Sequence, residues 1–114
     1  MADCIFCKII KGELPSTKVF EDENIVAFKD INPMAPVHVL IVPKIHFSSL
    51  TEAEDDHQVL LGKLLLIARD LAKKLEISKK GYKVVINNGP DSGQIVYHLH
   101  LHLLGGWTNK VNSV

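Results

Sequence analysis

Three histidines lie at alternate positions in one apolar run near the end of the chain. Residues 98 to 104 read His-Leu-His-Leu-His-Leu-Leu, and Gly105 and Gly106 follow at once. Imidazole changes protonation near neutral pH and can act as nucleophile, base, acid or metal ligand. Alternate side chains of a β-strand point to one face, so the spacing predicts three imidazoles in a row, roughly 7 Å apart. The run predicts a reactive site or a metal site.

A second group of reactive residues lies at the other end of the chain, where Cys4 and Cys7 have C-x-x-C spacing. The segment around them has no basic stretch followed by a long apolar one, as an export signal would. In a protein without such a signal, this spacing favours metal binding or thiol redox chemistry over a structural disulfide. A thioredoxin-like motif would follow a strand, and no strand fits before residue 4, which disfavours the redox alternative.

Composition limits the class of protein. The chain has 114 residues, of which 46% are apolar and 23% charged, and this fits one domain over residues 1–114. Thirteen basic and thirteen acidic residues cancel, so there is no positive field to hold nucleic acid by its phosphates. No apolar run reaches the length of a membrane span. We therefore expect a cytoplasmic protein that binds neither nucleic acid nor membrane.

Glycines and prolines divide the chain into elements. A short helix is expected over 3–11, and strands over 19–21 and 25–29 around a turn. A rigid, proline-containing loop over 32–36 precedes a strand over 37–42 that is apolar on both faces except for His38. These elements predict a sheet whose central strand is covered on both sides.

A long helix is expected to follow, beginning at Thr51, because Thr51 and Glu54 have the spacing of a capping box. Its apolar positions extend around most of the helix circumference, which leaves two uses for the surplus: a homodimer contact, or deeper burial in the chain's own core. Strands over 82–87 and 96–104 complete the pattern. The order of elements predicts an α+β domain with a mainly antiparallel sheet.

The histidine run is similar to the histidine triad signature, in which three histidines alternate with apolar residues and two apolar residues follow. Segments 4–10, 28–33, 36–38, 42–46 and 93–98 also resemble that family, in the same order. The Gly-Gly ending resembles the branch of nucleotide-binding proteins that hydrolyse nucleoside phosphoramidates; dinucleoside polyphosphate hydrolases usually carry a proline there. The resemblance implies an antiparallel sheet of about five strands with one long and one short helix, dimerising into a continuous sheet.

The resemblance also implies a reaction. His100 would attack the α-phosphorus of a purine nucleoside monophosphate derivative and form a covalent nucleotidyl-histidine, a role that suits a neutral imidazole. His102 and His38 would contact phosphate oxygens and move a proton to the leaving amine, with no divalent metal needed for the chemistry. Taken alone, His38 also fits a hydrogen-bonded histidine of the core.

Nucleotide recognition follows from the same resemblance. Asp30 would accept hydrogen bonds from the ribose hydroxyls, although an aspartate before Asn-Pro is also a common turn residue. Asn87 and the amide of Gly93 would face the α-phosphate, near Ile95, which replaces a serine of several animal members. The base would lie between apolar side chains that could equally pack in the core, namely Ile5, Phe6, Phe28 and Ile31.

Members of the family that carry such cysteines resemble this chain in pairing them with two histidines. The resemblance implies a structural Zn²⁺ bound by Cys4, Cys7, His46 and His98. Two other classes remain open from sequence: a metal-binding module in which the triad itself holds the ion, and a nucleotide-binding scaffold with little activity. A dinucleoside polyphosphate hydrolase of the same superfamily is the alternative enzyme.

Overall fold

The computed structural model describes residues 4–111 and contains one antiparallel sheet. Its strands follow the order β1-β2-β3-β5-β4, and their bounds are β1 Lys18–Glu21, β2 Ile25–Lys29, β3 Val37–Pro43, β4 Tyr82–Val85 and β5 Leu101–Gly105. The expected α+β class and antiparallel sheet are confirmed. Within residues 4–111, no helix is both long and apolar enough to cross a membrane.

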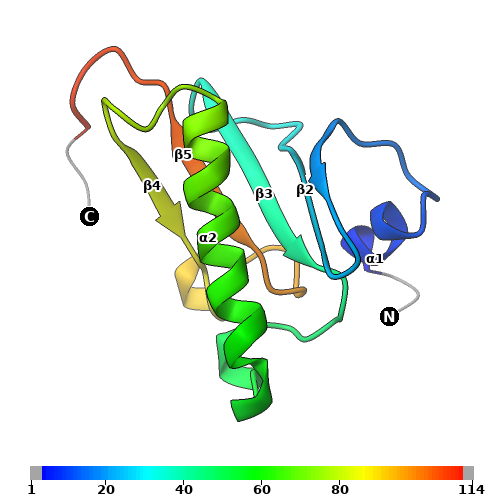
Figure 1. The fold of residues 1–114 in the computed structure, drawn as a ribbon. Helices are drawn as coiled ribbons and strands as arrows, with labels where there is room; N and C mark the ends of the chain where they lie inside the picture. The colour runs from blue at the N-terminus through cyan, green and yellow to red at the C-terminus, as the bar shows by residue number, and fades with distance from the viewer. Residues whose placement is uncertain (1–3, 112–114) are drawn as a thin grey trace.

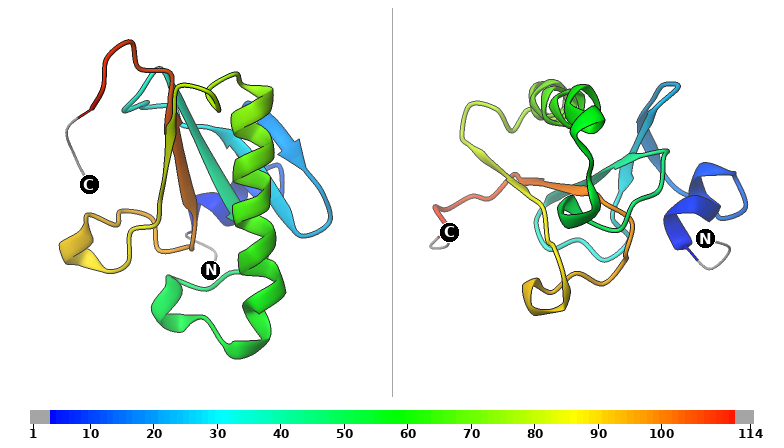
Figure 2. Two further views of the ribbon diagram at one scale, coloured as in Figure 1. Left: turned by 60° about the vertical axis from the view of Figure 1, so that its left-hand side comes forward. Right: turned by 90° about the horizontal axis from the view of Figure 1, so that it is seen from below.

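A helix packs on each face of the sheet. The long helix α2 (Gln58–Lys74) lies across one face (Figure 1), where it packs against alternate residues of β2 and β3 such as Ile25 and Ile41. The intervening residues, including Val26 and Val42, face the short helix α1 (Ile5–Ile10) on the other side (Figure 2). Both faces of β3 are therefore buried, as its continuous apolar run predicts.

The start of the long helix differs from the expectation. Two short 3₁₀ turns, Leu50–Glu52 and Asp55–His57, precede α2, which begins seven residues after Thr51. The capping box lies at Glu54 and His57, where the Glu54 N–H donates to His57 Nδ1 at 2.9 Å. The His57 ring also stacks on Phe47, with centroids 4.6 Å apart. This tertiary contact favours the later cap, so the predicted start at Thr51 was wrong.

The last strand is also shorter than expected, because β5 begins at Leu101 rather than at residue 96. Before it, the Leu99 N–H donates to the Phe47 carbonyl at 2.8 Å, away from the sheet ladder. Of the three triad histidines, His102 alone lies in the ladder, opposite Leu40. The three imidazoles are therefore not an evenly spaced row on one strand face, and this part of the expectation was wrong.

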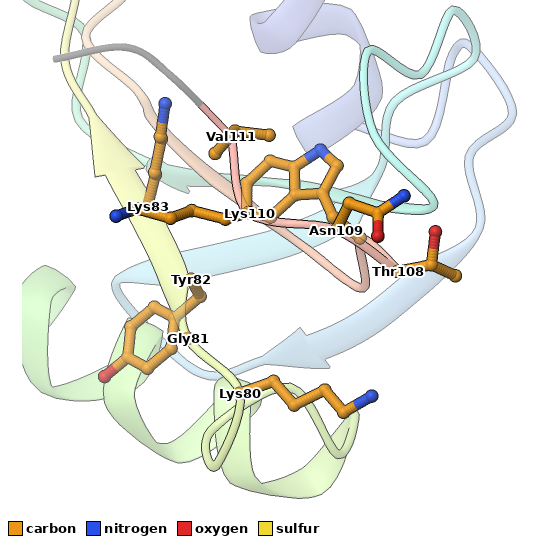
Figure 3. Close-up of a pocket in the computed structure, with 9 residues that line it drawn as sticks. Lys80, Gly81, Tyr82, Lys83, Thr108, Asn109, Lys110 and Val111 are labelled. Carbon is orange, nitrogen blue, oxygen red and sulfur yellow. The ribbon is translucent and has the colours of Figure 1, made fainter.

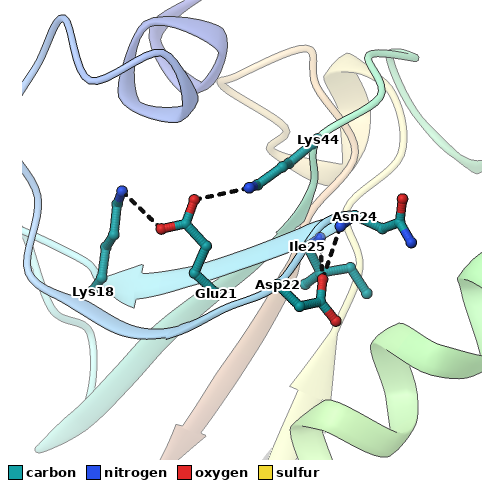
Figure 4. Close-up of polar contacts among 6 residues, drawn as sticks. All are labelled: Lys18, Glu21, Asp22, Asn24, Ile25 and Lys44. Atoms are coloured by element: carbon teal, nitrogen blue, oxygen red, sulfur yellow. Dashed lines mark hydrogen bonds and ion pairs between the residues drawn. The ribbon is translucent and has the colours of Figure 1, made fainter.

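Polar contacts fix the β1–β2 hairpin that leads to the site (Figure 4). Asp22 Oδ1 accepts hydrogen bonds from the N–H groups of Asn24 and Ile25, both at 2.8 Å, which closes the turn. Glu21 lies 2.8 Å from the Nζ of Lys44, the residue that follows β3. Such exposed ion pairs contribute roughly 0–1 kcal/mol each, so the hairpin geometry comes mainly from the turn and the buried strand.

Candidate active site and metal centre

Two neighbouring strands bring the candidate catalytic histidines together. His38 lies near the start of β3, and His102 lies one residue into β5. Their rings are hydrogen-bonded, with His38 Nε2 and His102 Nδ1 2.9 Å apart. The His100 ring lies 4.8 Å from the His102 ring, centroid to centroid. His38 and His100 are buried, whereas His102 is half-buried. The structure thus brings together the three residues that the resemblance assigns to catalysis.

The hydrogen bonds of His38 determine where the protons of the pair lie. The Met34 N–H donates to His38 Nδ1 at 3.0 Å, so this nitrogen must be an acceptor. A neutral imidazole carries its proton on the other nitrogen, so His38 Nε2 donates to His102 Nδ1. His102 therefore keeps its own proton on Nε2. The result is a chain of donors that leaves an N–H of His102 available to a substrate.

The tautomer of His100 is fixed in the opposite sense. His100 Nδ1 lies 2.8 Å from the His98 carbonyl oxygen, which can only accept. The proton of neutral His100 is therefore on Nδ1, and Nε2 has a free lone pair. A donor N–H on His102 and a lone pair on the neighbouring His100 ring suit attack on an electrophile that also accepts a hydrogen bond.

Burial keeps these rings neutral. Desolvation lowers the pKa of His102 to about 4, and the neighbouring His100 and His38 rings add to this effect. Burial also lowers the pKa values of His38 and His100. The Asp30 carboxylate opposes these shifts in part, because a nearby negative charge favours the protonated ring. At neutral pH the site presents uncharged imidazoles.

Asp30 lies beside the histidine pair, just after β2. Its Oδ2 is 3.5 Å from His38 Nε2, and its Oδ1 accepts the Asn32 N–H at 2.8 Å. The second contact is the Asx turn that a turn aspartate makes, so Asp30 fulfils that role. Its side chain is still 20% exposed. The carboxylate is therefore within reach of a ligand as well as of His38.

The four candidate zinc ligands converge on the far side of His100, at the start of α1. Their ligand atoms all lie within 4.8 Å of one another, and the residues are Cys4, Cys7, His46 and His98. His98 Nδ1 is 3.4 Å from Cys4 Sγ and 3.7 Å from Cys7 Sγ, and His46 Nδ1 is 3.4 Å from Cys7 Sγ. Cys4 also caps α1, because its sulfur accepts the Cys7 N–H.

The spacing of these atoms fits tetrahedral zinc. Bonds of about 2.3 Å to sulfur and 2.0–2.1 Å to nitrogen place neighbouring S and N ligands roughly 3.6 Å apart. His98 Nε2 lies 2.7 Å from the Pro43 carbonyl oxygen, so it donates there and leaves Nδ1 as the ligand. Burial and the adjacent Cys4 thiol raise the pKa of Cys7, a cost that a bound cation would remove. The cluster is a structural zinc site by its donor set and geometry.

The apolar candidates for a base pocket differ in burial: two are buried and two are exposed. Phe6 and Phe28 are 4% and 3% exposed and pack edge to face in the core beneath α1. Ile5 is 50% exposed and Ile31 89% exposed. The two phenylalanines therefore serve the core, and the two isoleucines present apolar surface.

The loop between β4 and β5 contains the remaining candidates. Gly93 has a φ of +89°, which requires glycine, and Ile95 is 89% exposed. Asn87 is half-buried. Sequence reasoning gave Gln94 no role, yet this buried side chain holds the loop: its Oε1 accepts the Gly89 N–H, and its Nε2 donates to the Ser48 and Val96 carbonyls. The sequence signal for Gln94 was its position next to Gly93 in segment 93–98, which resembles the family.

A hollow of about 570 Å³ lies between β4 and the segment after β5 (Figure 3). Lys80, Lys83 and Lys110 contribute to its walls, and Lys83 Nζ lies 5.8 Å from the centre of the Trp107 ring. Lys83 and His38 both pair with Leu104, from the two strands that flank β5. None of the predicted site residues lines the hollow.

Comparison with known proteins agrees with this geometry. The HIT domain model matches residues 11–109. The 14 kDa zinc-binding protein of Zea mays is 55% identical over 104 residues, covering 90% of this chain and 80% of its own. A HIT family hydrolase from Clostridium thermocellum has a TM-score of 0.95 at 46% identity, covering 100% of this chain and 99% of its own.

A histidine triad nucleotide-binding protein from Candida albicans has a TM-score of 0.80 at 39% identity, covering 97% of this chain and 87% of its own. The sequence match and the structural match both identify a HIT domain over most of the chain, and the matched structures include a HIT family hydrolase. The chain belongs to the HIT domain family.

Proposed function

We propose that this protein hydrolyses the P–N bond at the α-phosphate of purine nucleoside phosphoramidates through a nucleotidyl-His100 intermediate. The proposal rests on the opposite tautomers that the hydrogen bonds imply, with a lone pair on His100 Nε2 and an N–H on His102 Nε2 in rings whose centroids lie 4.8 Å apart. The Gly105-Gly106 ending, typical of the phosphoramidate branch, favours this substrate class over dinucleoside polyphosphates.

In the first step, the lone pair of His100 Nε2 forms a bond to phosphorus and the P–N bond breaks. The departing nitrogen takes its electron pair and receives a proton from His102 Nε2, which leaves a negative charge shared by the hydrogen-bonded His102–His38 pair, next to the positive charge of nucleotidyl-His100. His100 keeps its Nδ1 proton on the His98 carbonyl, so the intermediate is a cationic imidazolium and a good leaving group. In the second step, water attacks phosphorus, returns a proton to His102 and releases the nucleoside monophosphate and His100.

Recognition of the nucleotide would use the groups around these rings. The exposed part of Asp30 offers acceptor oxygens to the ribose hydroxyls. Ile5 and Ile31 provide exposed apolar surface for a purine. Asn87, Gly93 and Ile95 are assigned to the phosphate side.

A catalytic metal in place of the triad is the second candidate, because Asp30, His38 and His102 also have ligand atoms within 4.8 Å of one another. However, both nitrogens of His38 are already used, one by the Met34 N–H and the other by His102. An ion would have to break one of these hydrogen bonds. The geometry therefore favours zinc at the cysteine site and metal-free chemistry at the histidines.

We also propose a homodimer. Val59, Leu65 and Leu66 of α2 are 83%, 52% and 51% exposed, and β4 pairs with β5 on one side and lies at the edge of the sheet. Covering the helix residues and pairing two β4 edges would bury the apolar surface and make one continuous sheet from two copies.

The experiment is hydrolysis of an adenosine phosphoramidate by the wild type and by His100→Ala, with and without excess chelator. We expect the wild type to remain active in chelator while circular dichroism shows it folded, and mass spectrometry of a quenched single turnover to find the nucleotide on His100. Wild-type rates for His100→Ala would exclude the nucleophile. Loss of activity in chelator from a folded protein would support the catalytic metal.

A further inference from the structure

We propose that Phe6 is a positioning residue for the nucleophile and holds the His100 ring in its attacking orientation. This inference rests on the proposed function, in which His100 attacks phosphorus. It assigns Phe6 a role different from contact with the base.

The aromatic contacts of Phe6 point to this role. Its ring lies 4.9 Å from the His100 ring at an interplanar angle of 89°, and 5.9 Å from the His98 ring at 65°. These are edge-to-face distances at which aromatic rings attract one another. Phe6 therefore touches both the nucleophile and the neighbouring residue whose carbonyl fixes the nucleophile's tautomer.

His100 needs such a contact because its hydrogen bond alone leaves freedom. The torsion that rotates a histidine ring about its own bond to Cβ has a broad energy profile. The bond from Nδ1 to the His98 carbonyl restrains one edge of the ring. A perpendicular ring at 4.9 Å restrains its tilt. The two contacts together determine where the Nε2 lone pair points.

Phe6 is itself held firmly. It is 4% exposed, packs edge to face on Phe28 at 5.6 Å, and is the second residue of α1. A helix of six residues is not stable alone, so this helix depends on its packing and on Cys4 and Cys7, the zinc ligands on either side of Phe6. Ile5, at 50% exposure, is far better placed than Phe6 to contact a base.

The test compares Phe6→Leu and Phe6→Met with Ile9→Ala, which removes apolar packing from the same helix and the same cluster. Each variant is assayed on an adenosine phosphoramidate and on a methyl phosphoramidate that has neither base nor ribose. We expect kcat for both Phe6 variants to fall about two- to tenfold on both substrates, with KM little changed. Ile9→Ala should keep kcat on both. Thermal midpoint and zinc content are recorded for every variant.

A second readout does not require turnover. In ¹⁵N spectra of histidine-labelled protein, the His100 Nδ1–H resonance should shift or broaden in both Phe6 variants and stay in place in Ile9→Ala. A loss confined to the adenosine substrate would overturn the proposal in favour of base contact. An equal loss in Ile9→Ala, or an unmoved His100 resonance, would also overturn it. Absence of wild-type hydrolysis of the adenosine substrate would instead contradict the proposed function, and the spectra would still test the contact.

Discussion

The acid side of the pH–rate profile offers a direct test of a neutral, buried nucleophile. A solvated histidine with a pKa near 6.5 would lose activity about thirtyfold between pH 7.5 and 5.0, because that is the fall in its neutral fraction. Burial lowers the pKa of His102 to about 4, so about nine-tenths of that ring remains neutral at pH 5.0. Burial lowers the pKa of His100 in the same direction. We therefore expect kcat/KM to fall less than thirtyfold over this range.

The assay is hydrolysis of an adenosine phosphoramidate monoester at constant ionic strength, with the uncatalysed rate subtracted at each pH. Asp30→Asn is the matched variant, because the Asp30 charge raises the pKa values of His38, His100 and His102. Its acid limb should move to still lower pH. A wild-type limb centred near pH 6.5, unchanged in Asp30→Asn, would refute both the burial argument and the electrostatic role of Asp30.

Three further results are expected. Gly105→Ala should lower the free energy of unfolding in urea by about 1–3 kcal/mol, because a Cβ there would lie 2.7 Å from Ile77 Cδ1; an unchanged midpoint would show that Ile77 moves freely. Cys7→Ser should reduce zinc below one ion per chain by elemental analysis and lower the thermal midpoint, and full zinc content would disprove the ligand set. Leu66→Asp should convert a dimer into a monomer in sedimentation velocity, and an unchanged sedimentation coefficient would remove α2 from the interface.

Local sequence patterns predicted most of the secondary structure. The turn between residues 21 and 25 and the apolar run over 37–42 predicted three strands that the structure contains almost to the residue. The predictions failed where a distant contact decided the backbone. The cap of α2 moved to His57 because its ring stacks on Phe47, and the strand before His102 was shortened because Leu99 bonds to the Phe47 carbonyl.

The sequence alone indicated the candidate residues of the site and the family that they resemble. Residue types and their spacing can be read without knowledge of the fold. Through the resemblance, His38 could therefore be assigned to the same site as the histidine run, and His46 to the same site as the two cysteines. Only the tertiary structure decided how one short segment can place its histidines in two different sites. His98 lies before the strand. Its ring contacts the cysteines, its carbonyl oxygen accepts a hydrogen bond from His100, and Phe6 packs against the His98 and His100 rings. Tautomers and ring orientations depend on partners far away in the chain, such as the Met34 N–H and the Pro43 carbonyl, and no local pattern encodes them.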